Sequence, residues 1–311
     1  MSSESNEAKS LQRSGFVVRK ERFYGRLIAA CAVLTIAVTV GIILALSGRA
    51  FSFWSQISPV AYFTGTSWSP VIARNYGVLP LISGTLLVTV FSALIALPIG
   101  LAAAIYLSEY ASDRARSILK PALEILAGVP TVIYGYMALV YITPFFKGIF
   151  PSLRTFNVLS ASIVVGIMII PMVSSISEDA LSAVPDSLRQ GGYGLGSTKF
   201  DVSTKIVVPS ATSGIVASYV LAISRAIGET MAVTMAMGMS PQMPYFPDVF
   251  RNLAESGQTI TAAMVQIANA DSLGSGPTYE AMFALGMTLF AITLTMNVLA
   301  ELVRRRFREE Y

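Results

Sequence analysis

The sequence SRAIGET, from Ser224 to Thr230, places two ionisable residues inside an apolar run that extends from about 207 to 237. A run of this length is sufficient to cross a bilayer as a helix, which takes about 20 residues. Each charge at mid-depth costs about 2.5–3.5 kcal/mol on insertion scales, so charges there usually mark a transport pathway or a relay. The stretch therefore predicts a membrane span that carries a polar site.

The two charged residues of this stretch are Arg225 and Glu229, four positions apart. In a continuous helix this spacing puts both side chains on one face, where they can form an ion pair. One interpretation is that they line a pathway for a charged solute, and the other is that the pair only locks two helices together. A guanidinium offers five donors shaped for oxyanions. We therefore expect an anion to pass Arg225.

The composition is that of a membrane protein. Of the 311 residues, 54% are hydrophobic and 13% charged, and the mean hydropathy is +0.64. Soluble domains carry about 25% charged residues. The single cysteine, Cys31, cannot form a disulfide within the chain, and histidine is absent. Histidine-dependent metal sites and catalytic triads are excluded, so we expect neither a cofactor nor a metal.

The hydropathy pattern predicts an all-α protein with six spans. They are expected at 27–47, 78–107, 121–146, 158–177, 207–236 and 281–303. The first is too long for the core of a signal peptide, so we expect a retained span rather than a cleaved leader. The other segments are then an N-terminal tail (1–26), an outer loop (48–77), a core (78–303) with an inner loop (178–206), and a C-terminal tail (304–311).

The lysines and arginines predict the orientation. With the N-terminus inside, the inner segments hold 16 of the 22 basic residues and the outer segments hold 5. Such a bias places both termini in the cytoplasm. The basic residues then serve as anchors beside membrane lipid, and no nucleic acid is needed to explain the pI of about 9.2. The seven aromatic residues of the outer loop are expected to form a belt at the membrane interface.

The inner loop is polar and is interrupted by Pro185. A short helix is expected between Asp186 and Gly196, with Asp186 as its N-cap. The glycines at 191, 192, 194 and 196 favour a loose or tightly turned end. By composition alone, this loop is a solvated segment that could dock a partner.

This loop resembles the coupling motif of ABC-importer permeases, which is Glu-Ala-Ala, three residues, Gly, nine residues, Ile-x-Leu-Pro. The matching positions are Gln190-Gly191-Gly192, Gly196 and the segment from Ile206 to Pro209. The spacing agrees throughout, while Gln replaces Glu, Gly replaces both Ala, and Val replaces Leu. The two glycines are expected to weaken the coupling helix by about 1 kcal/mol each.

The wider pattern resembles phosphate-importer permeases, and most of all the PstC family, over roughly 50–303. The segments that carry this likeness are Gly65-Thr66-x-Trp68-x-Pro70, the segment from Tyr76 to Thr85, the segment from Gly128 to Gly135, and Arg225-Ala226-Ile227-Gly228-Glu229-Thr230-Met231-Ala232. The resemblance implies a type I importer fold of the MetI kind in the inner membrane of a bacterium or archaeon.

The resemblance also implies partners: a second permease like PstA, a cytoplasmic ATPase dimer like PstB, and an external phosphate-binding protein like PstS. The chain has no G-x-x-x-x-G-K-[ST] sequence with which to bind ATP itself, so it is expected to be a transport subunit rather than an enzyme. Glu229 would hold the Arg225 side chain in place or accept a proton from phosphate. The alternatives are a permease for another oxyanion, such as sulfate or molybdate, and a self-sufficient secondary anion transporter.

Overall fold

The computed structural model describes residues 15–270 and 276–306. The chain divides into two units, Met1–Arg49 and Ala50–Tyr311, and helix α2 (Gly15–Gln56) begins in the first. Within the described residues, five helices are long and apolar enough to cross a membrane, or six if one bent pair counts as a span. This number agrees with the predicted six spans, and the chain is a multi-pass membrane protein.

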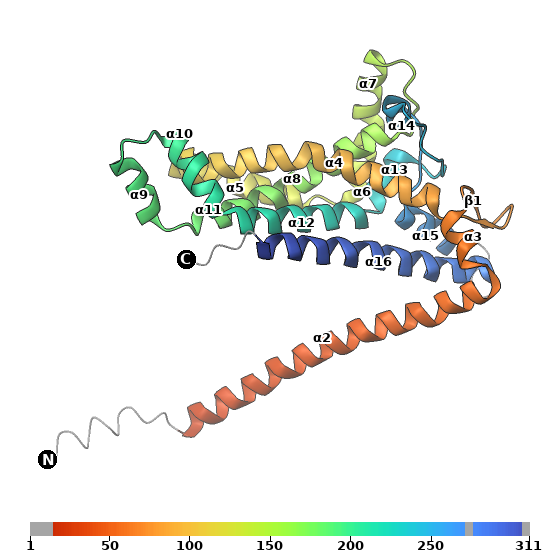
Figure 1. Ribbon diagram of the computed structural model, residues 1–311, viewed down its shortest axis with the longest axis horizontal. Coiled ribbons are helices and arrows are strands. Elements are labelled where there is room, and N and C mark those ends of the chain that lie inside the picture. Colours follow the sequence, from red (N-terminus) through yellow and green to blue (C-terminus); the bar gives the residue numbers. More distant parts are fainter. Residues whose placement is uncertain (1–14, 271–275, 307–311) are drawn as a thin grey trace. The chain divides into compact units, whose positions relative to one another are not determined.

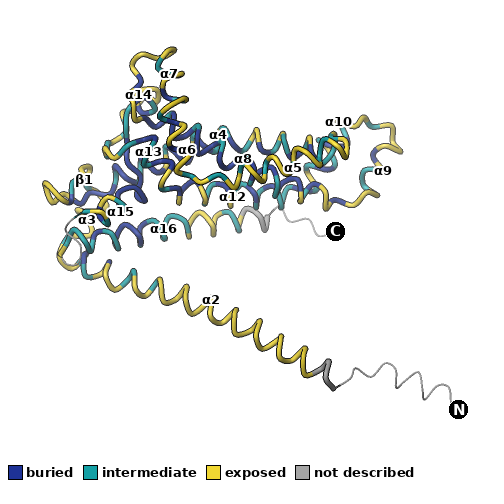
Figure 2. The backbone as a smooth tube through the Cα atoms, turned by 180° about the vertical axis from the view of Figure 1, so that it is seen from behind, coloured by how far each residue is buried: buried dark blue, intermediate teal, exposed yellow. Residues whose placement is uncertain are grey.

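Four long helices of the second unit lie side by side (Figures 1 and 2). They are α4 (Leu79–Ile105), α8 (Val158–Ser182), α12 (Thr212–Gly228) and α16 (Pro277–Arg306). Helices α4 and α8 approach so closely that a Cβ at Gly100 would lie 2.6 Å from Val173 Cβ. Small residues at a helix contact permit such an approach in lipid, where close packing drives association.

The predicted span 207–236 is wrong as a single helix. A π-helical turn, η3 (Ser203–Val207), and the short α11 (Val208–Ser210) precede α12. The helical segment Lys199–Ser210 is bent by 70° from α12. The bend lies at Ala211, whose backbone (φ −88°, ψ 1°) leaves helical geometry two residues after Pro209. At its other end α12 stops at Gly228, and a separate helix, α13 (Met231–Met237), follows.

The predicted span 121–146 is also interrupted. Helix α5 (Asp113–Gly128) ends before Val129, whose backbone is extended. The residue before a proline avoids helical geometry, and Pro130 accounts for this break. The apolar segment that is long enough to span runs from Thr131 to Ile149. It consists of α6 (Thr131–Met137), the π-helical turn η2 (Ala138–Ile142) and α7 (Thr143–Ile149).

The aromatic belt predicted for 48–77 is wrong for its central members. Phe53 and Tyr62 are 0% exposed, and Trp68 and Tyr76 are also buried. They form one packed cluster with residues of α15 (Ile260–Ala268) and α16. The loop contains α3 (Pro59–Thr64) and two antiparallel strands, β1 (Trp68–Ser69) and β2 (Asn75–Tyr76), with Trp68 opposite Tyr76. A helix α14 (Val249–Ala254) lies near α7 at the same end of the unit (Figure 1).

Candidate functional site

A cavity of about 310 Å³ lies among helices α5, α8 and α12. Most of its lining is apolar, from residues such as Leu123, Met168 and Pro171. Four charged residues also line it: Lys120, Glu124, Glu178 and Arg225. Its size suits a small solute, and its charged residues come from three different helices.

Arg225 is the charged residue that α12 contributes to this cavity. It lies in the last turn of α12, where the helix dipole favours a cation. The residue is exposed, and among the described residues no ion pair joins it to a carboxylate. Its five donors are therefore available to a solute in the cavity.

Glu229 does not share a helical face with Arg225, and the predicted pairing is wrong. Helix α12 ends at Gly228, and Glu229 adopts an extended backbone. Its Oε1 accepts a hydrogen bond from the backbone N–H of Ala232 at 3.2 Å, which stabilises the start of α13. Its carbonyl oxygen accepts one from Thr261 Oγ1 at 2.9 Å. Glu229 is 8% exposed and connects the start of α13 to the first turn of α15.

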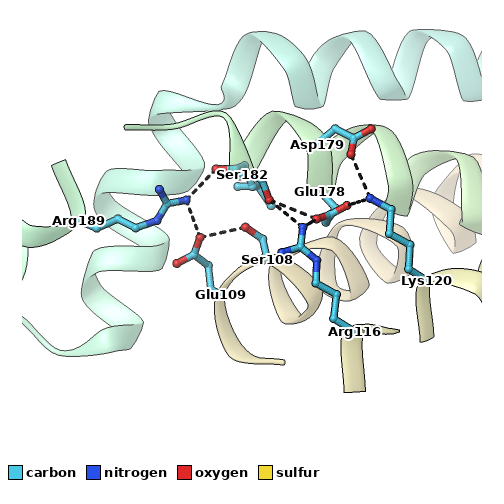
Figure 3. A network of polar contacts seen from close by, with 9 residues as sticks. Ser108, Glu109, Arg116, Lys120, Glu178, Asp179, Ser182 and Arg189 are labelled. Carbon is cyan, nitrogen blue, oxygen red and sulfur yellow. Dashed lines mark hydrogen bonds and ion pairs between the residues drawn. The ribbon is translucent and has the colours of Figure 1, made fainter. Parts of the chain in front are cut away.

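A polar network borders the cavity at its Lys120 side (Figure 3). Glu178 is 1% exposed and accepts hydrogen bonds from Arg116 and from Lys120 Nζ, the latter at 2.7 Å. Lys120 also reaches Asp179 at 3.3 Å, and Ser182 Oγ donates to Glu178 at 3.2 Å. The bond to Glu178 raises the pKa of Lys120 above its usual value. Two cations of α5 are thereby fixed to α8.

The inner loop folds as predicted into a short helix, α9 (Asp186–Gly194). The residue before its first turn is Pro185, so the expected N-cap role of Asp186 is wrong. Asp186 is instead the first helical residue and pairs with Arg189 at 3.2 Å. Gln190 is exposed, as is Gly191.

Close packing around Gly192 explains why glycine occupies a position that is alanine in the coupling motif. A Cβ there would lie 2.6 Å from Ile206 Cδ1 and 2.9 Å from Val202 Cγ2, so α9 packs at this glycine against the segment before α12. Gly196 turns the chain after α9 with a φ of +81°, a conformation that glycine adopts readily. Pro209 lies at the bend before α12.

The sequence alone does not identify several polar residues of this region. Lys120 lies just before the predicted third span (121–146), Glu124 lies near its start, and Glu178 is the first residue of the inner loop. Glu124 and Glu178 are acidic residues near the ends of apolar runs, and this position in the sequence is a signal for a functional role. No sequence pattern connects Glu178 to Arg116, which is 62 residues away.

The fold is that of the membrane subunits of type I ABC importers. A chain of a bacterial alginate ABC transporter, crystallised with its alginate pentasaccharide-bound periplasmic protein, superposes with a TM-score of 0.63. The match covers 96% of this chain and 100% of that chain at 13% identity. A chain of the MetNI methionine ABC transporter matches 75% of this chain and 95% of its own length, with a TM-score of 0.54 and 16% identity.

Sequence comparison gives the family. Residues 96–309 match the model of the binding-protein-dependent transport system inner membrane component. The phosphate transport system permease protein PstC of Xylella fastidiosa is 34% identical, over 88% of this chain and 89% of that protein. The probable ABC transporter permease protein YqgH of Bacillus subtilis is 38% identical, over 72% of this chain and 74% of that protein. The chain belongs to this family of transport permeases, in the group that includes the PstC proteins.

Proposed function

We propose that the chain is a permease subunit of an ATP-driven importer of inorganic phosphate. The relatives named PstC, from bacteria and from the archaeon Methanocaldococcus jannaschii, support phosphate as the substrate. The chemistry of Arg225 also supports phosphate as the substrate. Its guanidinium lines a cavity of about 310 Å³. Among the described residues, no carboxylate forms an ion pair with it. A guanidinium binds a phosphate through two parallel hydrogen bonds.

In this proposal phosphate passes Arg225 while the cavity belongs to a pathway shared with a second permease like PstA. The cation offsets the charge of the anion in a cavity whose lining is mostly apolar. Glu124 lines the same cavity as Arg225. Glu229 supports the site indirectly, because its carboxylate fixes the start of α13 just after Arg225 in the chain.

The proposal assigns α9 to coupling with a pair of cytoplasmic ATPase subunits like PstB. Three large apolar side chains near α9 are exposed, namely Tyr193, Leu195 and Phe200, and Leu195 is 89% exposed. Exposed apolar residues at the end of a loop favour a protein contact. Gln190 and Gly191 are exposed beside them. A phosphate-binding protein like PstS would dock at the end of the second unit that is opposite to α9. In this orientation both termini would lie in the cytoplasm.

The substitution Arg225→Gln tests the pathway. It removes the charge from an exposed side chain, so the complex should assemble in normal amounts while phosphate uptake is lost. Arg114→Gln is the matched control, because Arg114 is an exposed arginine of α5 that does not line the cavity. Uptake of radiolabelled phosphate is measured beside the amount of co-purified ATPase. Normal uptake in the Arg225→Gln variant would refute the assignment.

A further inference from the structure

Arg189 connects the short helix α9 to two of the long helices. Its Nη2 donates to Glu109 Oε1 at 3.0 Å and to the carbonyl oxygen of Leu181 at 2.8 Å. Its Nη1 donates to the carbonyl oxygen of Val184 at 2.5 Å. Glu109 belongs to the π-helical turn η1 (Tyr106–Tyr110) that ends α4, and Leu181 lies in the last turn of α8. One guanidinium therefore holds three elements together (Figure 3).

This contact is largely shielded from water. The side chain of Arg189 is 15% exposed and that of Glu109 is 5% exposed. Ser108 Oγ donates a further hydrogen bond to Glu109 Oε1 at 3.1 Å. One carbonyl acceptor, Leu181, lies in the last turn of α8, and the other, Val184, lies two residues beyond the helix end. The helix dipole favours a cation at this end. Removing one partner of such a buried ion pair costs much more free energy than removing one partner of an exposed pair.

Helix α9 needs such an attachment. It has nine residues and contains three glycines, so it would not be stable as an isolated helix. Its opposite contact, at Gly192, is with Val202 and Ile206 in the segment that leads to α12. Leu188 packs into the apolar cluster at this end of the unit. Arg189 is thus its polar attachment to α4 and α8, while Gly192 is its apolar attachment to the α12 segment.

We infer that Arg189 is a positioning residue through which a displacement of α9 moves α4 and α8 together. The inference rests on the proposed function, because that function assigns α9 to the ATPase contact. Glu109 is the partner that extends the connection from α8 to α4. Without this pair, α9 keeps its apolar contacts, including that of Leu188 with the cluster to which α4 and α8 contribute, but loses its polar attachment to α4. A displacement of α9 then moves α4 less, so ATP hydrolysis and transport become less tightly coupled.

The test compares Arg189→Gln with wild type in the full complex, reconstituted in liposomes. Phosphate uptake and ATP hydrolysis are measured on the same preparation, and Arg114→Gln is again the control. We expect the amount of phosphate moved per ATP to fall about tenfold, a typical effect of disrupting a coupling network. In Arg189→Lys this ratio of phosphate to ATP should fall less, because the lysine keeps a positive charge near Glu109. Glu109→Gln should resemble Arg189→Gln.

The swap Glu109→Arg with Arg189→Glu separates the pair from the individual side chains. The swapped variant should recover part of the wild-type ratio of phosphate moved to ATP hydrolysed. The ion pair is restored in it, while the hydrogen bonds to the two carbonyl oxygens are not. A ratio unchanged from wild type in Arg189→Gln would overturn the inference. So would a fall in the amount of assembled complex with an unchanged ratio, because that result indicates a purely structural role.

A second measurement does not depend on phosphate. Spin labels at Gln190→Cys on α9 and Ala102→Cys on α4, in a Cys31→Ala background, report the distance between these helices. We expect one narrow distance distribution with Arg189 present and a broad one after Arg189→Gln. Narrow distributions in both would overturn the inference. If instead the labels behave as expected but the wild-type complex does not import phosphate, the proposed function fails and the attachment stands.

Discussion

At Glu178, a carboxylate that is only 1% exposed is held by Arg116 and Lys120, two cations of the neighbouring helix α5. Burial of a lone carboxylate would cost several kcal/mol, and the two cations offset that cost through hydrogen bonds as well as charge. Asp179, the next residue, contacts the same lysine but is 67% exposed. The two acidic residues therefore differ in environment although they share a partner.

This difference leads to a prediction at the residue scale. Glu178→Gln should lower the stability of the chain by about 1–3 kcal/mol, because charged hydrogen bonds in a buried place are lost. Asp179→Asn should cost less than about 1 kcal/mol, since exposed ion pairs contribute little. The midpoint of thermal unfolding in detergent measures both variants. Equal shifts would contradict the role assigned to burial.

At the same scale, the sequence was informative about Arg225 and misleading about Glu229. A charge in an apolar run is visible in the sequence, and Arg225 does line a cavity. An i, i+4 spacing places two side chains on one face only within a continuous helix, but α12 ends at Gly228. The helix ends between the two residues, so their spacing no longer places them on one face. The contacts that fix Glu178 and Arg189 join distant segments, and a single sequence does not reveal them.

At the scale of the element, α9 forms despite three glycines because tertiary contacts hold it. Its glycines are not equivalent. A Cβ at Gly191 would meet nothing within 4 Å, whereas one at Gly192 would lie 2.6 Å from Ile206 Cδ1 and 2.9 Å from Cγ2 of the buried, β-branched Val202. The first glycine therefore only weakens the helix, while the second allows it to pack.

The two positions should respond to alanine with opposite signs. Gly191→Ala should stabilise α9 by about 1 kcal/mol, the difference in helix propensity. Gly192→Ala should destabilise it, because overpacking typically costs about 1–3 kcal/mol and exceeds that gain. Hydrogen exchange of the α9 amides measures local stability in each variant. Greater protection in Gly192→Ala than in wild type would contradict the packing seen at Ile206.

The apolar runs predicted the number and rough positions of the spans but not their interruptions. Hydropathy averages over many residues, so it does not detect a single extended residue such as Val129 or the bend after Pro209. Pro130 is a sequence signal for the break at Val129, because the residue before a proline avoids helical geometry. Composition does not distinguish a packed cluster from an interfacial belt, so it does not predict the burial of the aromatic residues of 48–77.

At the scale of the whole molecule, α9 and the loop after α7 lie at opposite ends of the second unit (Figure 1). The distribution of lysine and arginine predicts that the α9 end faces the cytoplasm. This orientation decides which end meets an ATPase and which meets an external binding protein.

Cysteine labelling tests the orientation. In a Cys31→Ala background, Ser187→Cys on α9 should react with a membrane-impermeant maleimide only after the cells are permeabilised. Ser152→Cys, in the loop after α7, should react in intact cells. Both positions are exposed, so access depends on the side of the membrane. The reverse pattern would show that the predicted orientation is wrong.

We propose above that this chain moves phosphate as one subunit of an ATP-driven importer. The most direct measurement is uptake of radiolabelled phosphate into liposomes that contain either the co-purified complex or this chain alone. We expect uptake only with the complex, with ATP and with the binding protein, and no competition from excess sulfate or molybdate. Uptake by the chain alone would show that it needs no ATPase, and uptake that sulfate or molybdate abolishes would show that phosphate is not its specific substrate. Either result would contradict the proposed function.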